Sequence, residues 1–104
     1  MSADILIIDD EADIRDLIAG ILQDEGYETR EAANSTECLS AIANRRPNLV
    51  ILDIWLRGSE LDGIEILQKI KKISQDLPII MISGHGNIET AVNTIKMGAY
   101  DFIE

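Results

Sequence analysis

Two short apolar runs in this 104-residue chain each end in aspartate, and no other feature constrains the fold as strongly. The first run covers residues 5–8 and stops at Asp9 and Asp10, and the second covers 49–52 and stops at Asp53. Unbroken runs of branched apolar residues are typical of strands that are buried on both faces of a parallel sheet. If the two strands are neighbours, the three carboxylates meet at the edge where open α/β sheets bind their ligands.

A cluster of three carboxylates is costly for a folded protein. Two carboxylates about 4 Å apart repel by roughly 4 kcal/mol at an effective dielectric constant near 20. Such a cluster is therefore expected only where a cation or a reaction needs it. Carboxylate oxygens suit Mg²⁺, which keeps several waters and also accepts phosphate oxygens. The alternative is that the acids are unrelated helix caps and a loop aspartate.

Strand and helix patterns alternate along the whole chain without a linker or a repeat. A stripe of apolar residues with helical spacing runs from Ile14 to Leu22, and similar stripes follow the later strands. Shorter strand patterns lie at 27–30, 79–82 and 99–104. This alternation predicts a flavodoxin-like α/β fold, with a parallel sheet of order 2-1-3-4-5 and helices on both faces.

Several other residues are interpreted as structural. Asn34 and Asn87 precede helical stripes and are expected to cap those helices. Gly98 is expected to end the last helix in the left-handed conformation. Cys38 lies on an apolar stripe and is interpreted as a core residue rather than a reactive thiol. His85 is interpreted as a loop residue rather than a phosphate carrier.

Composition limits the partners and the compartment. Nine basic and nineteen acidic side chains give a net charge of −10, so we expect no direct contact with nucleic acid or a membrane. A single cysteine suits a reducing cytoplasm. The N-terminus has no signal-peptide pattern, and no apolar run approaches the roughly 20 residues of a membrane span. We therefore expect one cytoplasmic domain over residues 1–104.

The acids and one serine suggest phosphoryl chemistry. Asp53 stands alone at the end of the central strand and is best placed as a nucleophile, whereas the adjacent Asp9 and Asp10 can chelate a cation. Attack of a carboxylate on phosphorus gives an aspartyl phosphate, and Mg²⁺ would neutralise the charge on the transferring group. Ser83 follows the fourth strand and would offer a hydroxyl donor to an anion held there.

Taken in their order along the chain, five sequence motifs resemble those of the receiver domains of two-component response regulators. The resemblance covers the whole chain. It rests on Ile-Ile-Asp-Asp-Glu at 7–11, Val-Ile-Leu-Asp at 50–53, Asp62-Gly63, Ile-Ser-Gly at 82–84 and Gly-Ala-Tyr-Asp-Phe at 98–102. The sequence is most similar to the NtrX-type nitrogen regulators. In those proteins a σ54-type ATPase domain and a DNA-binding helix-turn-helix domain follow the receiver.

The resemblance implies a role for each acid. Asp53 would accept the phosphoryl group from a sensor histidine kinase, so that the chain catalyses only its own phosphorylation and dephosphorylation. Asp10 and Asp53 would bind Mg²⁺ directly, and Asp9 would act through water. The backbone carbonyl of Trp55 would supply a further oxygen.

The same resemblance implies how the signal leaves the site and controls transcription. Ser83 would move toward the phosphoryl group, and Phe102, in preference to Tyr100, would be the aromatic switch that turns inward with it. A homodimer would form through the fourth helix and the fifth strand. The side chain of Trp55 is interpreted either as a gatekeeper over the site or as a partner contact.

Two departures from the family pattern stand out. The segment from Asp53 to Gly63 is about two residues longer than is usual, and residues 57–60 replace the usual proline turn. The family's lysine would fall just beyond Glu104, together with a fifth helix that is missing from this chain. We therefore expect the native polypeptide to continue past Glu104.

Without the fifth helix, one face of the sheet is expected to lack its cover. The residues expected to form an exposed apolar patch are Ile5, Ile7, Ile79 and Met81. The fragment would then dimerise, swap elements or aggregate at micromolar concentration.

Three other functions share parts of this pattern. A flavodoxin would need a loop rich in Ser, Thr and Gly after the first strand, where this chain has Asp9, Asp10 and Glu11. A phosphohydrolase of the haloacid dehalogenase type would need a second acid two residues after Asp53, where Trp55 stands. A pseudo-receiver that acts as an unphosphorylated scaffold stays the alternative, although it usually lacks one of the acids.

Overall fold

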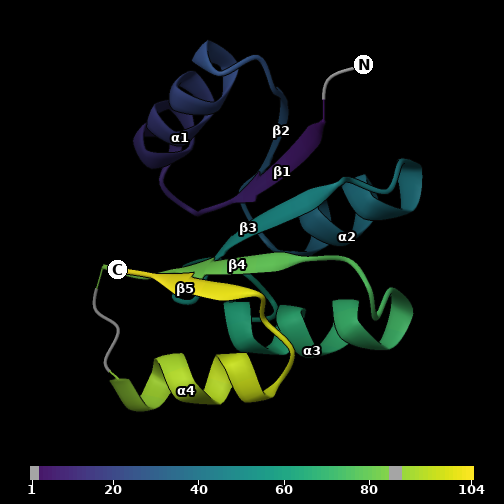
Figure 1. Ribbon diagram of the computed structural model, residues 1–104, viewed down its shortest axis with the longest axis vertical. Coiled ribbons are helices and arrows are strands. Elements are labelled where there is room, and N and C mark those ends of the chain that lie inside the picture. Colours follow the sequence, from purple (N-terminus) through teal and green to yellow (C-terminus); the bar gives the residue numbers. More distant parts are fainter. Residues whose placement is uncertain (1–2, 85–87) are drawn as a thin grey trace.

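The computed structural model describes residues 3–84 and 88–104, in which strands and helices alternate (Figure 1). The elements in chain order are β1 (Asp4–Ile8), α1 (Ala12–Asp24), β2 (Glu28–Ala32), α2 (Ser35–Asn44), β3 (Leu49–Asp53), α3 (Gly63–Ile73), β4 (Ile79–Ile82), α4 (Ile88–Lys96) and β5 (Asp101–Ile103). The described residues therefore contain five strands and four helices.

All five strands join one parallel sheet in the order β2-β1-β3-β4-β5. β1 and β3 are neighbours, with Ile8 in register with Leu52. β4 lies on the other side of β3, with Ile82 in register with Asp53. The predicted flavodoxin-like fold and its strand order are confirmed, and the carboxyl ends of β1, β3 and β4 meet at one edge.

Two apolar clusters hold the helices to the sheet. The larger cluster joins one face of the sheet to α2 and α3, and it includes Leu6, Leu52 and Ile66. The smaller cluster lies on the other face, where Ile5 and Ile7 pack with α1. Side chains alternate between the faces of a strand, so neighbouring residues of β1 belong to different clusters.

Four strand residues that were expected to be exposed are instead buried: Ile5, Ile7, Ile79 and Met81. Ile5 and Ile7 are covered by α1. Ile79 and Met81 lie on the opposite face, because they are in register with Val50 and Leu52 of the larger cluster. The predicted patch is therefore wrong for these four residues.

Other apolar side chains are exposed. On α1, Leu17 is 60% exposed and Ile21 is 57% exposed, and Ile103 of β5 is also exposed. A second group of exposed apolar residues lies on α4 and just after it: Ile88, Val92, Ile95, Met97 and Tyr100. The face covered by α1 and the surface of α4 thus each carry a group of exposed apolar side chains, and Tyr27, Trp55 and Ile73 are exposed elsewhere.

Two helix ends explain why β2 and β5 begin later than the sequence pattern suggests. Gly26 has a φ of +93°, and the next residue, Tyr27, donates its backbone N–H to the carbonyl oxygen of Leu22 at 3.1 Å. Gly98 has a φ of +108°, and Ala99 donates in the same way to Thr94 at 3.0 Å. These are Schellman motifs, which use the residue after each glycine to end the preceding helix.

The structural roles predicted for Asn34 and Cys38 are confirmed. The side chain of Asn34 accepts the backbone N–H of Glu37 at 2.9 Å and so caps α2. Cys38 is fully buried, and burial raises the pKa of its thiol to about 12. Asn87 and His85 lie outside the described residues.

Candidate functional site

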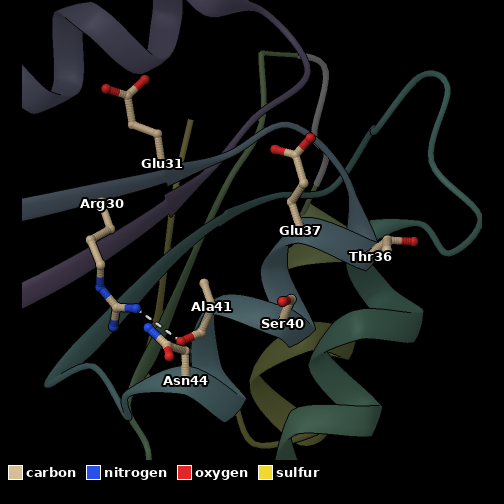
Figure 2. A pocket seen from close by; sticks show the side chains of 7 residues that line it. All are labelled: Arg30, Glu31, Thr36, Glu37, Ser40, Ala41 and Asn44. Carbon is tan, nitrogen blue, oxygen red and sulfur yellow. Dashed lines mark hydrogen bonds between the residues drawn. The ribbon is translucent and has the colours of Figure 1, made fainter.

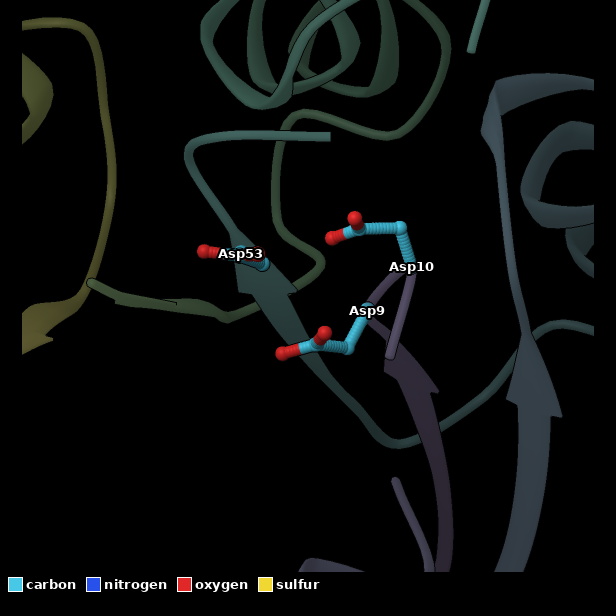
Figure 3. Close-up of side chains that lie close together, drawn as sticks. All are labelled: Asp9, Asp10 and Asp53. Atoms are coloured by element: carbon cyan, nitrogen blue, oxygen red, sulfur yellow. The ribbon is translucent and has the colours of Figure 1, made fainter. Parts of the chain in front are cut away.

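Asp9, Asp10 and Asp53 come together at the carboxyl edge of the sheet (Figure 3). One carboxylate oxygen from each lies within 4.8 Å of the other two. Asp9 and Asp10 follow β1, and Asp53 is the last residue of β3. The convergence expected from the two apolar runs is therefore confirmed.

Local hydrogen bonds fix the position of Asp9. Its buried carboxylate accepts the backbone N–H of Glu11 at 2.8 Å. Its backbone carbonyl oxygen accepts Nη1 of Arg15 at 2.6 Å, and Nε of Arg15 pairs with Glu31 at 3.2 Å. The turn between β1 and α1 is thus held from both sides, and Arg15 joins it to β2.

Asp53 carries the strongest electrostatic perturbation in the site. Burial is the largest cause that raises the pKa of Asp53 to about 7, followed by the negative charges of Asp9, Asp10 and Glu11. A hydrogen bond from the backbone N–H of Trp55 to Oδ1 of Asp53, 3.4 Å long, lowers the pKa but does not offset these effects. Without a cation, the site therefore resists full ionisation at neutral pH.

Asp9 shows the same behaviour. Burial raises its pKa above the ordinary value, and the charges of Asp10 and Glu11 add to this, whereas the hydrogen bond from Glu11 opposes it. A cation among the three carboxylates would reverse both shifts, because it favours the ionised forms. The donors are all hard oxygens, which fits a divalent cation such as Mg²⁺.

Ser83 follows β4, the strand that neighbours β3 and therefore Asp53. It is buried, it comes one residue after the register partner of Asp53, and its backbone N–H donates to Ile103 at 3.1 Å. This bond extends the pairing of β4 with β5 to the edge of the sheet where the acids lie.

The aromatic residues named from the sequence have different surroundings. Phe102 is in register with Met81 and packs, half-buried, against the larger cluster. Tyr100 lies before β5 and is 75% exposed. The indole of Trp55 is also exposed, and the backbone N–H of that residue is the group that contacts Asp53.

Gly63 is a site residue whose role the sequence did not reveal. It begins α3 against the end of β3, where its N–H donates to the carbonyl oxygen of Ile54 at 2.9 Å. A Cβ atom at this position would overlap the carbonyl oxygen of Asp53. The Asp62-Gly63 pair was visible as a motif, but the need for close backbone contact was not.

A second charged cluster lies at the opposite end of β1. Asp4 is 7% exposed and pairs with Arg30 at 2.8 Å and with Arg45 at 3.2 Å. Burial raises the pKa of Asp4, but the hydrogen bonds and charges of the two guanidinium groups outweigh burial, so the pKa lies below its ordinary value.

Arg30 of this cluster also borders a shallow groove between β2 and α2 (Figure 2). It donates to the carbonyl oxygen of Ala41 at 2.9 Å and to that of Arg45 at 2.7 Å, and it thereby closes the end of α2. The lining residues are Arg30, Glu31, Thr36, Glu37, Ser40, Ala41 and Asn44. None of the site residues named from the sequence is among them.

Comparison with known proteins gives consistent matches. Residues 5–104 match the family model of the response regulator receiver domain. The nitrogen assimilation regulatory protein NtrX of Azorhizobium caulinodans is 62% identical over 104 residues, which is 100% of this chain and 23% of that protein.

Solved structures agree with this match. The crystal structure of the receiver domain of NtrX from Brucella abortus is 64% identical with a TM-score of 0.94, and the match covers 97% of this chain and 84% of that one. A CheY-like receiver domain protein from Methanospirillum hungatei is 36% identical with a TM-score of 0.90, over 99% of this chain and 81% of that one.

The chain spans about a quarter of the NtrX protein from Azorhizobium, so it corresponds to one part of a longer relative. Among the described residues, no helix has the length and apolar character needed to cross a bilayer.

Proposed function

This chain belongs to the response regulator receiver domain family, and from that premise we propose that Asp53 accepts a phosphoryl group from a sensor histidine kinase. The observation that carries the proposal is the convergence of Asp9, Asp10 and Asp53 within 4.8 Å at the carboxyl edge of the sheet. The raised pKa of Asp53 shows that this convergence is costly without a cation. Carboxyl groups with a raised pKa are typical of sites that carry out a reaction.

In the proposed reaction, a carboxylate oxygen of Asp53 attacks the phosphorus atom of a phosphohistidine. The new O–P bond forms as the N–P bond breaks, and the electron pair of that bond returns to the imidazole nitrogen. Mg²⁺, held by Asp10, Asp53 and the backbone carbonyl of Trp55, with Asp9 acting through water, would neutralise charge on the transferring group. Later attack by water on phosphorus would release phosphate and restore the carboxylate.

We assign the switch to Ser83 and Phe102. Their places support this, because Ser83 lies one residue after the register partner of Asp53, and its N–H donates to the residue that follows Phe102. A hydroxyl group that turns toward a phosphoryl group would therefore act next to the strand that carries the aromatic ring. Phosphorylation would bias an equilibrium between two arrangements of β4 and β5.

The partners follow from the relatives. In a longer protein like NtrX, this domain would act in the cytoplasm and control ATPase and DNA-binding domains that regulate transcription of nitrogen-related genes. The net charge of −10 supports a role without direct DNA contact. The exposed apolar side chains of α4, among them Val92 and Ile95, support a homodimer through α4 and β5.

The proposal is tested with acetyl phosphate and Mg²⁺, followed by intact mass spectrometry. The wild type should gain the mass of one phosphoryl group, and the Asp53→Asn variant should gain none. Asp16→Asn, an exposed acid of α1, is the matched control and should be phosphorylated like the wild type. Equal labelling of the Asp53→Asn variant would refute the assignment, and no labelling of any protein would favour the unphosphorylated scaffold.

A further inference from the structure

We propose that Ser35 and Ser59 are positioning residues that hold the loop between β3 and α3, residues 54–62, and thereby fix the backbone of Trp55 beside Asp53. We call this pair, the hydrogen bond between the two serines and their hydrogen bonds to Leu61 the serine latch. The role in phosphoryl transfer rests on the function proposed above, whereas the role in holding the loop does not.

The serine latch is a closed ring of three hydrogen bonds. Oγ of Ser59 accepts the backbone N–H of Ser35 at 2.8 Å and donates to the carbonyl oxygen of Leu61 at 2.6 Å. Oγ of Ser35 accepts the backbone N–H of Leu61 at 3.1 Å. Ser35 is 2% exposed, so these bonds lie mostly away from water, where a lost partner is costly.

The loop completes the cap of α2. The first backbone N–H groups of a helix have no partner within the helix. At α2, Asn34 accepts the N–H of Glu37, and the Glu37 side chain accepts the N–H of Ala33 at 2.9 Å. Ser59 accepts the N–H of Ser35, the first residue of the helix. A residue of the loop thus performs a task that normally falls to the helix's own flanking residues.

A second anchor holds the end of the loop. Gly63 bonds to Ile54 at 2.9 Å and leaves no room for a Cβ atom beside Asp53. Leu61 packs, half-buried, against the larger cluster. With residues 59–63 and Ile54 held, only 55–58 lie between the two fixed points. Leu56 of this span packs, half-buried, against the larger cluster, and Gly58 makes the turn with a φ of +69°.

This short span carries the groups next to the acceptor. The N–H of Trp55 lies 3.4 Å from Oδ1 of Asp53, and the carbonyl of Trp55 is the oxygen assigned to the cation above. A short span between fixed points has fewer conformations than a long one. Without the serine latch, the span that positions Trp55 would lengthen from 55–58 toward 55–60, and the carbonyl would spend less time in place for a cation.

Trp55 is the only tryptophan in the chain, so its fluorescence reports on the loop directly. Ser35→Ala and Ser59→Ala should each increase acrylamide quenching of this fluorescence in EDTA. In a titration with Mg²⁺ alone, both should weaken binding about 10-fold, the lower end of the loss seen when an outer partner of a metal ligand is removed. Ser40→Ala, an exposed serine of the same helix, should match the wild type.

Two further variants distinguish the loss of these hydrogen bonds from a nonspecific destabilisation of the fold. Ser59→Thr keeps the hydroxyl group and should restore both the quenching and the Mg²⁺ affinity. If the two serines act as one unit, the double variant should bind Mg²⁺ no worse than either single variant. If Ser35→Ala does not fold, Ser59→Ala and Ser59→Thr decide the question alone.

The proposal is overturned if Ser59→Ala has the quenching and the Mg²⁺ affinity of the wild type, or if Ser59→Thr behaves like Ser59→Ala. These measurements need no phosphoryl donor. If the wild type takes up no phosphoryl group, the proposed function is refuted. The serine latch is still tested by the fluorescence of Trp55.

Discussion

The first residue of α3, Gly63, lies directly against the backbone of Asp53. A Cβ atom at Gly63 would overlap the carbonyl oxygen of Asp53 and would come within 2.6 Å of the Cα atom of Ile54. The position of Asp53 therefore depends on the absence of a side chain ten residues later. Both neighbours are backbone atoms, so they cannot move aside by changing a rotamer.

Gly63→Ala should destabilise the protein and displace Asp53. Overpacking of this kind costs about 1–3 kcal/mol, measured as the free energy of unfolding in urea. Phosphorylation of Asp53 by acetyl phosphate should also slow, because the end of β3 must shift. Gly20→Ala is the control, since a Cβ atom there meets no other atom within 4 Å and alanine favours the helix. Equal stability and labelling of the Gly63→Ala and Gly20→Ala variants would contradict this account.

Asp10→Asn should stabilise the protein in EDTA. Removal of one of three like charges relieves repulsion, and we expect a gain on the order of 1 kcal/mol in the free energy of unfolding. The same variant should lose most of the stabilisation that Mg²⁺ gives the wild type, because a ligand stabilises only the state that binds it. Thermal unfolding in EDTA and in Mg²⁺ measures both effects. Identical midpoints for variant and wild type under both conditions would argue against a metal site.

Asp4→Asn should lower the free energy of unfolding by about 2 kcal/mol at pH 7, less than for a fully buried pair because Arg45 is largely exposed. The pKa of Asp4 is lower in the folded state than its ordinary value of 3.8. Its contribution is therefore present above pH 3.8 and is lost as the pH falls through the folded pKa.

Urea unfolding at pH 7 and near pH 3 should thus show a difference between wild type and Asp4→Asn that shrinks in acid. Asp76→Asn is the matched control, because Asp76 pairs with Arg46 at 3.1 Å on the surface. That pair should contribute less than about 1 kcal/mol. A difference for Asp4→Asn that stays constant down to pH 3 would show that its ion pairs do not stabilise the fold.

The isolated chain should self-associate at micromolar concentration. Leu17 and Ile21 lie one turn apart on α1 and are both more than half exposed, which is unusual for a free surface. Sedimentation velocity should detect dimers or larger species, and Leu17→Gln combined with Ile21→Gln should reduce them. A clean monomer for the wild type would show that the exposed apolar residues are tolerated.

Local patterns were enough to locate the five strands, although not all of their first residues, and to predict that the three aspartates converge. The apolar runs before Asp9 and Asp53 identified two strands, and the alternation of elements identified the parallel sheet that brings these acids together. The local pattern did not show which residues of β4 face which side of the sheet. Whether Ile79 faces α1 or α3 depends on its register with Val50, which is set by pairing between strands and not by its neighbours in sequence.

The contacts that the sequence did not reveal join distant segments. Asp4 meets Arg30 and Arg45 across separations of 26 and 41 residues, and Ser35 meets Ser59 across 24. Each of these residues is ordinary in its own segment. Only the packing of α2 against the sheet and the β3–α3 loop gives them partners.

β1 is five residues long, with Asp4 at its start and Asp9 just after its end. Five residues of strand span about 16 Å, whereas each aspartate has charged neighbours that lie much closer to it. The aspartate held by arginines and the aspartate that faces other carboxylates are therefore each governed mainly by their own neighbours. Natural variation or protein engineering could change the stability of the scaffold mainly through the first aspartate, and the attraction of the site for cations mainly through the second.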